Sequence, residues 1–402
     1  MSTLFTGPRF GRPQLWAGAL LLVFFGECSW LIAHNAPSAV PAEEFTRVEQ
    51  GLEQWQGRKI AGLSVASQGS PDGFTPPVEA YEREHSPLWY LAESSALAAF
   101  HVAPGSVAGV WLSRIPYVFA GMLLGASLWY VSRRLYGNAG GYIALVLYCF
   151  SPTVIRESAL WFAAPNIPGV WGTFGAVFTA IAVAHTLYAP REVVLWNWPR
   201  ILLLGVSLAL AVGWHFGLVL LVPLLLAFMS YLAPARRWAA VVILLAGCAI
   251  ALLLLFSAYW FHPAMFWQGI RRAWPFDFSG AALGMSGAYL QVLKEVADSG
   301  PVLVLLAAGA LATYAVWRRT RYFGNTAPLL AALIFLGLRV ASPHEPQSVF
   351  SLAGMVFLLV FVAGIAADLL ETPARAACMA VLAGLLAANA IWNLVGLARI
   401  GI

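Results

Sequence analysis

Long apolar runs alternate with short polar or arginine-bearing stretches along nearly the whole chain. Because about 17–25 apolar residues suffice for a helix to cross a bilayer, each long run predicts a membrane-spanning helix. The first run covers residues 15–33. The other predicted spans are residues 107–131, 140–152, 166–188, 201–213, 217–231, 238–256, 302–317, 327–340, 348–370 and 376–395. The pattern therefore predicts an all-α, polytopic transmembrane bundle with about 11 spans.

The composition agrees with a chain surrounded by lipid. Of the 402 residues, 60% are hydrophobic and 10% are charged, whereas a soluble domain is about half apolar and a quarter charged. The formal net charge of +5 is explained by arginine at cytoplasmic helix ends and requires no acidic partner. The sequence has no basic patch interleaved with aromatic residues, which argues against nucleic-acid binding. We expect a single membrane domain over residues 1–402, with no soluble C-terminal domain.

The cysteines and the N-terminus add little chemistry. Each cysteine falls within an apolar run and none has a metal-type spacing to another, so we interpret all four as small buried hydrophobes. The apolar run at residues 15–33 lacks a small-residue cleavage site, which favours an uncleaved first helix. The four cysteines are Cys28, Cys149, Cys248 and Cys378.

Arginine positions predict the orientation. The pairs Arg133-Arg134, Arg236-Arg237 and Arg318-Arg319 recur at every second helix end. Because positive charge in short loops marks the cytoplasmic face, these ends and the N-terminus are expected in the cytoplasm. The two longest polar segments then lie outside, on the periplasmic side if the membrane is a bacterial inner membrane.

Those polar segments cover residues 34–86 and 259–300. Within the first, residues 43–56 carry apolar side chains at helical spacing, which predicts a helix on the membrane surface. The short apolar run to residue 100 that follows is interpreted as a re-entrant or interfacial segment. The second is long enough that a functional role is expected.

Charged residues in these segments suggest chemistry. Glu43 and Glu44 lie just past the first span, where a carboxylate can act as a general base. The alternative is a solvated acid stabilised at a helix N-terminus. Arg271 and Arg272 suit a phosphate clamp, or they anchor the chain at the interface beside neighbouring tryptophans. We interpret His215 as a hydrogen-bonded residue of a helix turn.

Five short motifs occur in a fixed order through the first half of the chain. They are Glu43-Glu44, Glu84-His85-Ser86-Pro87-Leu88, Arg114-Ile115-Pro116, Arg133-Arg134-Leu135-Tyr136-Gly137 and Ser151-Pro152. In order and spacing, the stretch resembles the polyprenyl-phosphate-sugar glycosyltransferases of the GT-C class. The nearest branch contains protein O-mannosyltransferases and lipid A aminoarabinose transferases. The chain departs from that pattern by having Glu43 in place of Asp and His85 in place of Lys, and by having Asn166 where a carboxylate often follows.

The resemblance implies an inverting membrane glycosyltransferase. It would move a sugar from polyprenyl phosphate to a lipid, glycan or protein acceptor on the extracytoplasmic face. Glu43 would be the base, assisted by Glu44. The resemblance further implies a divalent metal ion at Glu84 and His262, although one carboxylate and one imidazole form a thin ligand set for zinc. The candidate ligands of the donor phosphate are His85, Arg271, Arg272, Arg156 and Arg339.

Other interpretations stay open. Arg156 can instead pair with Glu157, and Arg339 can extend from its apolar run to the interface. The chain as a whole can be a non-catalytic GT-C-like subunit or lipid-binding partner. A transporter or flippase is a second alternative, which the lack of an inverted repeat and the concentration of charge in the outer loops disfavour.

Overall fold

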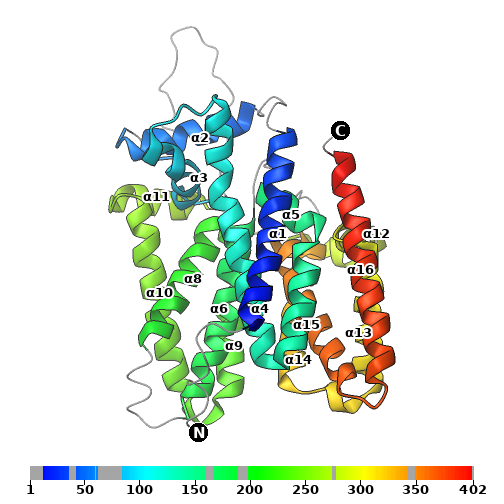
Figure 1. The fold of residues 1–402 in the computed structure, drawn as a ribbon. Coiled ribbons are helices and arrows are strands. Elements are labelled where there is room, and N and C mark those ends of the chain that lie inside the picture. Colours follow the sequence, from blue (N-terminus) through cyan, green and yellow to red (C-terminus); the bar gives the residue numbers. More distant parts are fainter. Residues whose placement is uncertain are drawn as a thin grey trace. The chain divides into compact units, whose positions relative to one another are not determined.

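The computed structural model describes residues 12–35, 42–58, 60–61, 84–159, 166–188, 198–273, 278–342 and 349–400. Nearly all of these residues are helical, and no strand occurs among them (Figure 1). The predicted all-α class is confirmed. The chain falls into two compact units, which are described separately below. Unit 1 contains Met1–Asn35, Gly121–Leu160 and Ser279–Ile402, and unit 2 contains Ala36–Ala120 and Trp161–Phe278.

Unit 2 combines short helices at one end with a bundle of longer apolar helices. The short helices are α2 (Ala42–Trp55), α3 (Pro87–Phe100) and α11 (Pro263–Arg272). The bundle consists of α6 (Ile167–Thr186), α8 (Trp198–Trp214), η1 (Phe216–Leu220), α9 (Leu221–Leu232), η2 (Pro234–Arg236) and α10 (Arg237–Ala258). The first part of α4 (Val107–Cys149) also belongs here.

Unit 1 holds the rest of α4 and the C-terminal helices. A break inside α4 falls at Gly137, whose φ of 75° is a conformation that glycine adopts readily. The other elements are α1 (Arg12–Asn35), α5 (Pro152–Ala159), η3 (Gly280–Gly284), α12 (Ser286–Asp298), α13 (Pro301–Val316), η4 (Arg318–Thr320), α14 (Phe323–Ala341), α15 (Val349–Leu370) and α16 (Arg375–Ile400).

Each predicted span corresponds to a helix. In the part of the chain that the structure describes, 7 helices are long and apolar enough to cross a membrane, or 8 if the bent pair α12–α13 is one span. The sequence-based number of about 11 is larger because α4 contains two of the predicted runs. In addition, α8 and the helix over Phe216–Leu232 are apolar but shorter than a full span. The chain is an integral membrane protein.

The second polar segment is also mostly helical where the structure describes it. It contains α11, η3 and α12. In α12 the buried residues Ala288, Val292 and Val296 recur every four positions, so one apolar stripe faces the core of unit 1. Helix α12 then meets α13 at a bend of 113°.

Close packing between α2 and α3 depends on Gly51. A Cβ atom at this position would lie 2.3 Å from the carbonyl oxygen of Tyr90 and 2.4 Å from the hydroxyl of Ser94. Glycine therefore allows the two backbones to approach in a way that a larger residue would block.

Replacing Gly51 by Ala is expected to destabilise the fold by about 1–3 kcal/mol, because the methyl group must displace the backbone of α3. The measurement is the thermal unfolding temperature of the purified chain in detergent. Gly18→Ala is the matched control, since a Cβ at Gly18 meets nothing within 4 Å. A Gly51→Ala variant as stable as the Gly18→Ala variant would contradict the close approach of α2 and α3.

Candidate functional site

The segment before α3 is bound to the break between α8 and η1. The backbone N–H of Ser86 donates to the carbonyl of Gly213 at 3.1 Å, and the N–H of Phe216 donates to the carbonyl of Glu84 at 2.8 Å. The Ser86 hydroxyl also donates to Gly213 O at 2.6 Å. Carbonyls in the last turn of a helix lack partners within the helix, and Ser86 supplies two donors for one of them. The Glu-His-Ser sequence is thereby fixed at the end of α8.

His215 lies at that break with one defined tautomer. Its Nδ1 accepts the backbone N–H of Gly217 at 3.0 Å and so caps η1. A neutral imidazole with an accepting Nδ1 carries its proton on Nε2. That Nε2 lies 4.0 Å from Oε2 of Glu84, whose side chain is 51% exposed. The His215 N–H is thus directed toward an accessible carboxylate, a pairing that the sequence did not suggest.

Aromatic contacts join His85, α3 and α2. The His85 ring stacks on Trp89 with a centroid distance of 4.4 Å, and its edge contacts His215 at 5.8 Å. The guanidinium of Arg47 on α2 lies 5.2 Å from the Trp89 ring centroid, a cation–π geometry. His85 and Arg47 therefore contact the same indole from different elements.

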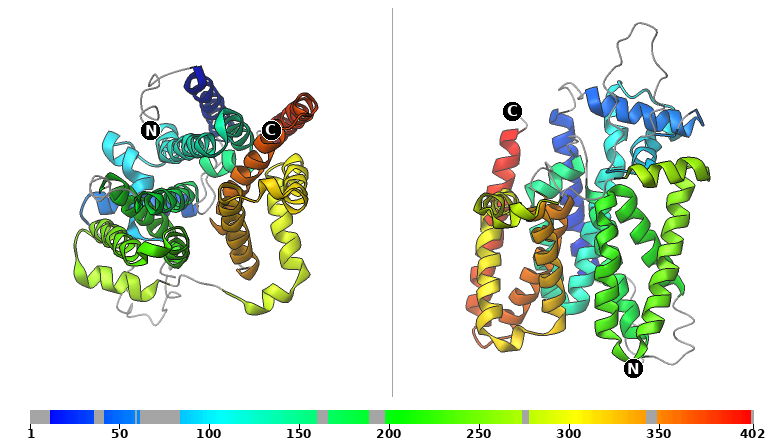
Figure 2. Two further views of the ribbon diagram at one scale, coloured as in Figure 1. Left: turned by 90° about the horizontal axis from the view of Figure 1, so that it is seen from below. Right: turned by 180° about the vertical axis from the view of Figure 1, so that it is seen from behind.

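Helix α2 is also joined to the turn that leads into α11. The buried Gln54 side chain donates from Nε2 to the carbonyl of Ala258 at 2.7 Å and accepts the N–H of Ala61 at 2.9 Å. A buried amide costs little when both its ends are hydrogen-bonded. Beside it, the rings of Trp55 and Trp260 meet edge-on at 6.0 Å. As a result α2, α3 and α11 lie together at the end of unit 2 where α10 ends (Figures 1 and 2).

The remaining candidate residues of this end lie in the first turn of α2 and at the two ends of α11. Glu43 and Glu44 fall in the first turn of α2, and their side chains lie outside the described residues. Arg271 and Arg272 are exposed in the last turn of α11. His262 is exposed at the start of α11, with its Nδ1 3.2 Å from the carbonyl of Tyr259.

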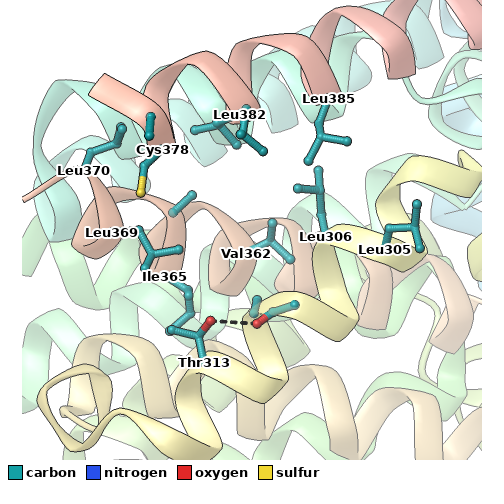
Figure 3. Close-up of a pocket in the computed structure, with 15 residues that line it drawn as sticks. Leu305, Leu306, Thr313, Val362, Ile365, Leu369, Leu370, Cys378, Leu382 and Leu385 are labelled. Carbon is teal, nitrogen blue, oxygen red and sulfur yellow. Dashed lines mark hydrogen bonds between the residues drawn. The ribbon is translucent and has the colours of Figure 1, made fainter. Parts of the chain in front are cut away.

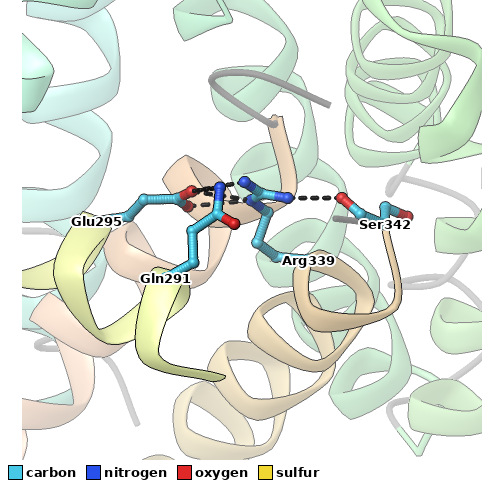
Figure 4. Close-up of polar contacts among 4 residues, drawn as sticks. All are labelled: Gln291, Glu295, Arg339 and Ser342. Carbon is cyan, nitrogen blue, oxygen red and sulfur yellow. Dashed lines mark hydrogen bonds and ion pairs between the residues drawn. The ribbon is translucent and has the colours of Figure 1, made fainter. Parts of the chain in front are cut away.

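Two further candidates belong to unit 1. Arg156 is exposed on α5. Arg339 on α14 is 1% exposed, and its Nη2 donates to Oε1 of Glu295 on α12 at 2.6 Å. Its Nε reaches Oε1 and Oε2 of Glu295 at 3.2 and 3.1 Å, and its Nη1 donates to the carbonyl of Ser342 at 2.6 Å (Figure 4). The Arg339 guanidinium therefore joins α12 to α14.

Glu84 and His262 are the candidate ligands of a metal ion at this end of unit 2. Among the described residues, no group of three or more His, Cys, Asp or Glu side chains is placed to hold one. Glu84 is paired with His215, whose Nδ1 is occupied by the Gly217 N–H. Glu84 and His262 alone are too few ligands to define a metal centre, and no chemical step is assigned to a metal ion.

Proteins similar to this chain are found by structure and not by sequence. No family model matches the chain, and no curated protein matches it by sequence. ArnT from Cupriavidus metallidurans, solved with undecaprenyl phosphate, is similar over 96% of this chain with a TM-score of 0.59 and 14% identity. The oligosaccharyltransferase AglB from Archaeoglobus fulgidus, solved with an inhibitory peptide and a dolichol-phosphate, is similar over 96% with the same TM-score and identity. A second A. fulgidus oligosaccharyltransferase structure, with Zn and sulfate, covers 92% of this chain with a TM-score of 0.55.

These likenesses show the fold of the chain. The chain is a polytopic membrane protein with the GT-C fold of lipid-phosphate-binding glycosyltransferases. It spans 62% of the ArnT chain and 53–55% of the two oligosaccharyltransferase chains. The resemblance found in the sequence motifs is thus confirmed at the level of the fold.

Proposed function

We propose that this protein is an inverting glycosyltransferase that moves a sugar from a polyprenyl-phosphate donor to an acceptor outside the cytoplasm. One observation carries this proposal beyond the fold. Contacts between Gln54 and Ala258, and between Trp55 and Trp260, hold α2 beside the start of α11. The helix with the first-segment acids and the helix with the second-segment arginines therefore belong to the same end of one unit.

In the proposed reaction, Glu43 removes the proton from the acceptor hydroxyl as that oxygen attacks the anomeric carbon. The bond from this carbon to the phosphate oxygen breaks, and the phosphate leaves with the electron pair. Because phosphate is a good leaving group, no strong general acid is required. A single displacement of this kind inverts the configuration at the anomeric carbon. Glu44 is proposed to orient the base.

Cations neutralise the charge that develops on the phosphate. Arg271 and Arg272 are exposed at the end of α11, and arginine binds phosphate with two parallel hydrogen bonds. We propose His85 as a further ligand of the same phosphate; its ring is buried against Trp89, which also contacts the Arg47 guanidinium. No role is proposed for Arg156 and Arg339, which belong to unit 1.

Charge along α10 supports the orientation. This helix begins at the arginine pair Arg236-Arg237 and ends at Ala258, where the Gln54 side chain of α2 donates to its carbonyl. Two ends of one spanning helix lie on opposite faces, and the arginine-bearing end is expected in the cytoplasm. The α2–α3–α11 end would then face the periplasm of a bacterial inner membrane.

The test is sugar transfer by the full chain in proteoliposomes, supplied with a panel of polyprenyl-phosphate sugars and candidate lipid, glycan and peptide acceptors. The expected result is transfer of one sugar with release of polyprenyl phosphate and inversion at the anomeric carbon. Donor binding without transfer for every acceptor would favour the non-catalytic lipid-binding alternative. Movement of the intact donor across the bilayer without transfer would favour a flippase.

A further inference from the structure

An apolar cleft opens between α13, α15 and α16 in unit 1 (Figure 3). Its volume is about 380 Å³, within the range of small-molecule sites. Aliphatic side chains such as Leu306, Val362 and Leu382 form the walls. The hydroxyl of Thr313 is directed back to the carbonyl of Gly309 at 2.8 Å. The walls therefore present hydrocarbon surface, which suits a hydrocarbon ligand.

The cleft follows the length of the helices that line it. From Leu305 to Thr313 on α13, and from Ala377 to Leu385 on α16, the lining extends over nine residues, which is about 12 Å of helix. Only 11% of the spanning segment of α16 is buried within the protein. One wall of the cleft thus belongs to a peripheral helix that is largely exposed to lipid.

Positive charge gathers beyond one end of the cleft. Thr313 and Cys378 both line it, and the N–H of Trp317 bonds to the carbonyl of Thr313 at 2.7 Å. Trp317 leads directly into η4, and α16 begins three residues before Cys378. Both helices therefore place arginine within about one turn of the cleft. The exposed arginines of this end are Arg318, Arg319, Arg321 and Arg375.

Acidic groups only partly balance these arginines. Glu371 accepts a hydrogen bond from Arg319 at 3.1 Å. Asp368 accepts from the side chain of Asn325 at 2.8 Å and from the hydroxyl of Tyr322 at 3.3 Å. Four arginines against these two carboxylates leave a net charge of +2 on the six side chains. An anion is therefore the complementary partner.

We propose that this cleft binds one anionic glycerophospholipid, with part of an acyl chain between α13, α15 and α16 and the head-group phosphate at the arginines. Hydrocarbon in the cleft and phosphate beyond it match the two ends of such a lipid. Arginine-bearing helix ends are expected at the cytoplasmic leaflet, where anionic phospholipids are abundant. This site is distinct from the α2–α3–α11 end, and its occupancy does not depend on glycosyl transfer.

Native mass spectrometry of the full-length protein in detergent tests the site. The probes are phosphatidylglycerol, phosphatidylcholine of the same acyl composition, and undecaprenyl phosphate. One phosphatidylglycerol per chain is expected to bind in preference to phosphatidylcholine. Because each arginine near a lipid phosphate contributes about a fivefold gain in affinity, the pair Arg318→Gln and Arg375→Gln should weaken binding about 30-fold. The corresponding Lys variants should retain most of it.

A second variant blocks the cleft without removing charge. Gly309 lines the cleft, and a Cβ there meets nothing within 4 Å, so Gly309→Leu should fill it and abolish the bound lipid. The matched control is Gly396→Leu on α16, where a Cβ also meets nothing within 4 Å; this variant should bind as wild type does. Equal binding of phosphatidylcholine, undecaprenyl phosphate binding that the Gly309→Leu variant abolishes, or phosphatidylglycerol binding that this variant leaves unaffected would each overturn the proposal.

Discussion

Replacing Glu43 by Gln is expected to lower kcat for sugar transfer by about 10²–10⁴-fold, the usual contribution of a positioned general base. The amide keeps the shape of the side chain but cannot take the proton of the acceptor hydroxyl. Donor affinity should change little, because the base acts on the acceptor. The measurement is kcat and the donor KM in proteoliposomes, with the donor and acceptor that support turnover by the wild-type chain.

Helix α2 offers a matched control for this experiment. Glu49 is exposed on the same helix, two turns further along, and Glu49→Gln removes the same charge from it. This variant should turn over at the wild-type rate. Glu44→Gln is expected to fall between the two, because an orienting group contributes less than the base. If Glu43→Gln keeps the wild-type kcat, the base must be sought elsewhere.

The largest expected effect on stability comes from the buried pair in unit 1. Replacing Arg339 by Met should cost about 2–4 kcal/mol, because it leaves Glu295 without its partner in a poorly solvated place. The Glu295 side chain is 24% exposed, against 1% for Arg339. This remaining access to water keeps the expected cost below that of a fully buried acid. Chemical or thermal unfolding in detergent measures the change.

An exposed pair in the same unit provides the comparison. The Arg319 Nη2 lies 3.1 Å from Oε2 of Glu371, and the two side chains are 65% and 67% exposed. Arg319→Met should therefore change the free energy of unfolding by no more than about 1 kcal/mol. The double variant Arg339→Met with Glu295→Leu should recover most of the lost stability, since no buried charge then remains. Equal losses from Arg339→Met and Arg319→Met would show that burial does not strengthen the α12–α14 pair.

Much of the fold follows from local sequence. Helix α2 was predicted within one residue at each end, since its polar and apolar positions alternate at helical spacing. The long apolar runs are helices for a different reason, because a backbone in lipid must satisfy its hydrogen bonds within its own segment. The interior of α12 was less apparent, because its buried positions are small residues within a polar segment. Local sequence therefore suggests a phosphate as the partner of Arg339 and does not reveal the ion pair with Glu295 on α12.

The site is harder to predict from the sequence, because its contacts join segments that are distant along the chain. Glu84 and His215 are 131 positions apart, and Gln54 bonds to a carbonyl 204 positions away. No local periodicity encodes such pairs. The arginine pairs at helix ends suggested that Glu84, His85, Arg271 and Arg272 belong to exterior segments. Only the packing of α2 against α3 and the α10–α11 turn shows that the segments share one end of unit 2.

The central claim is that this end of unit 2 holds the head group of a lipid-phosphate sugar. Photo-crosslinking with a polyprenyl-phosphate sugar that carries a photoreactive group near the phosphate, followed by peptide mapping, tests it directly. The expected result is labelling of peptides from α2–α3 and α11, competed by unmodified donor but not by phosphatidylglycerol. Labelling confined to other helices, or labelling that the unmodified donor does not reduce, would contradict the claim.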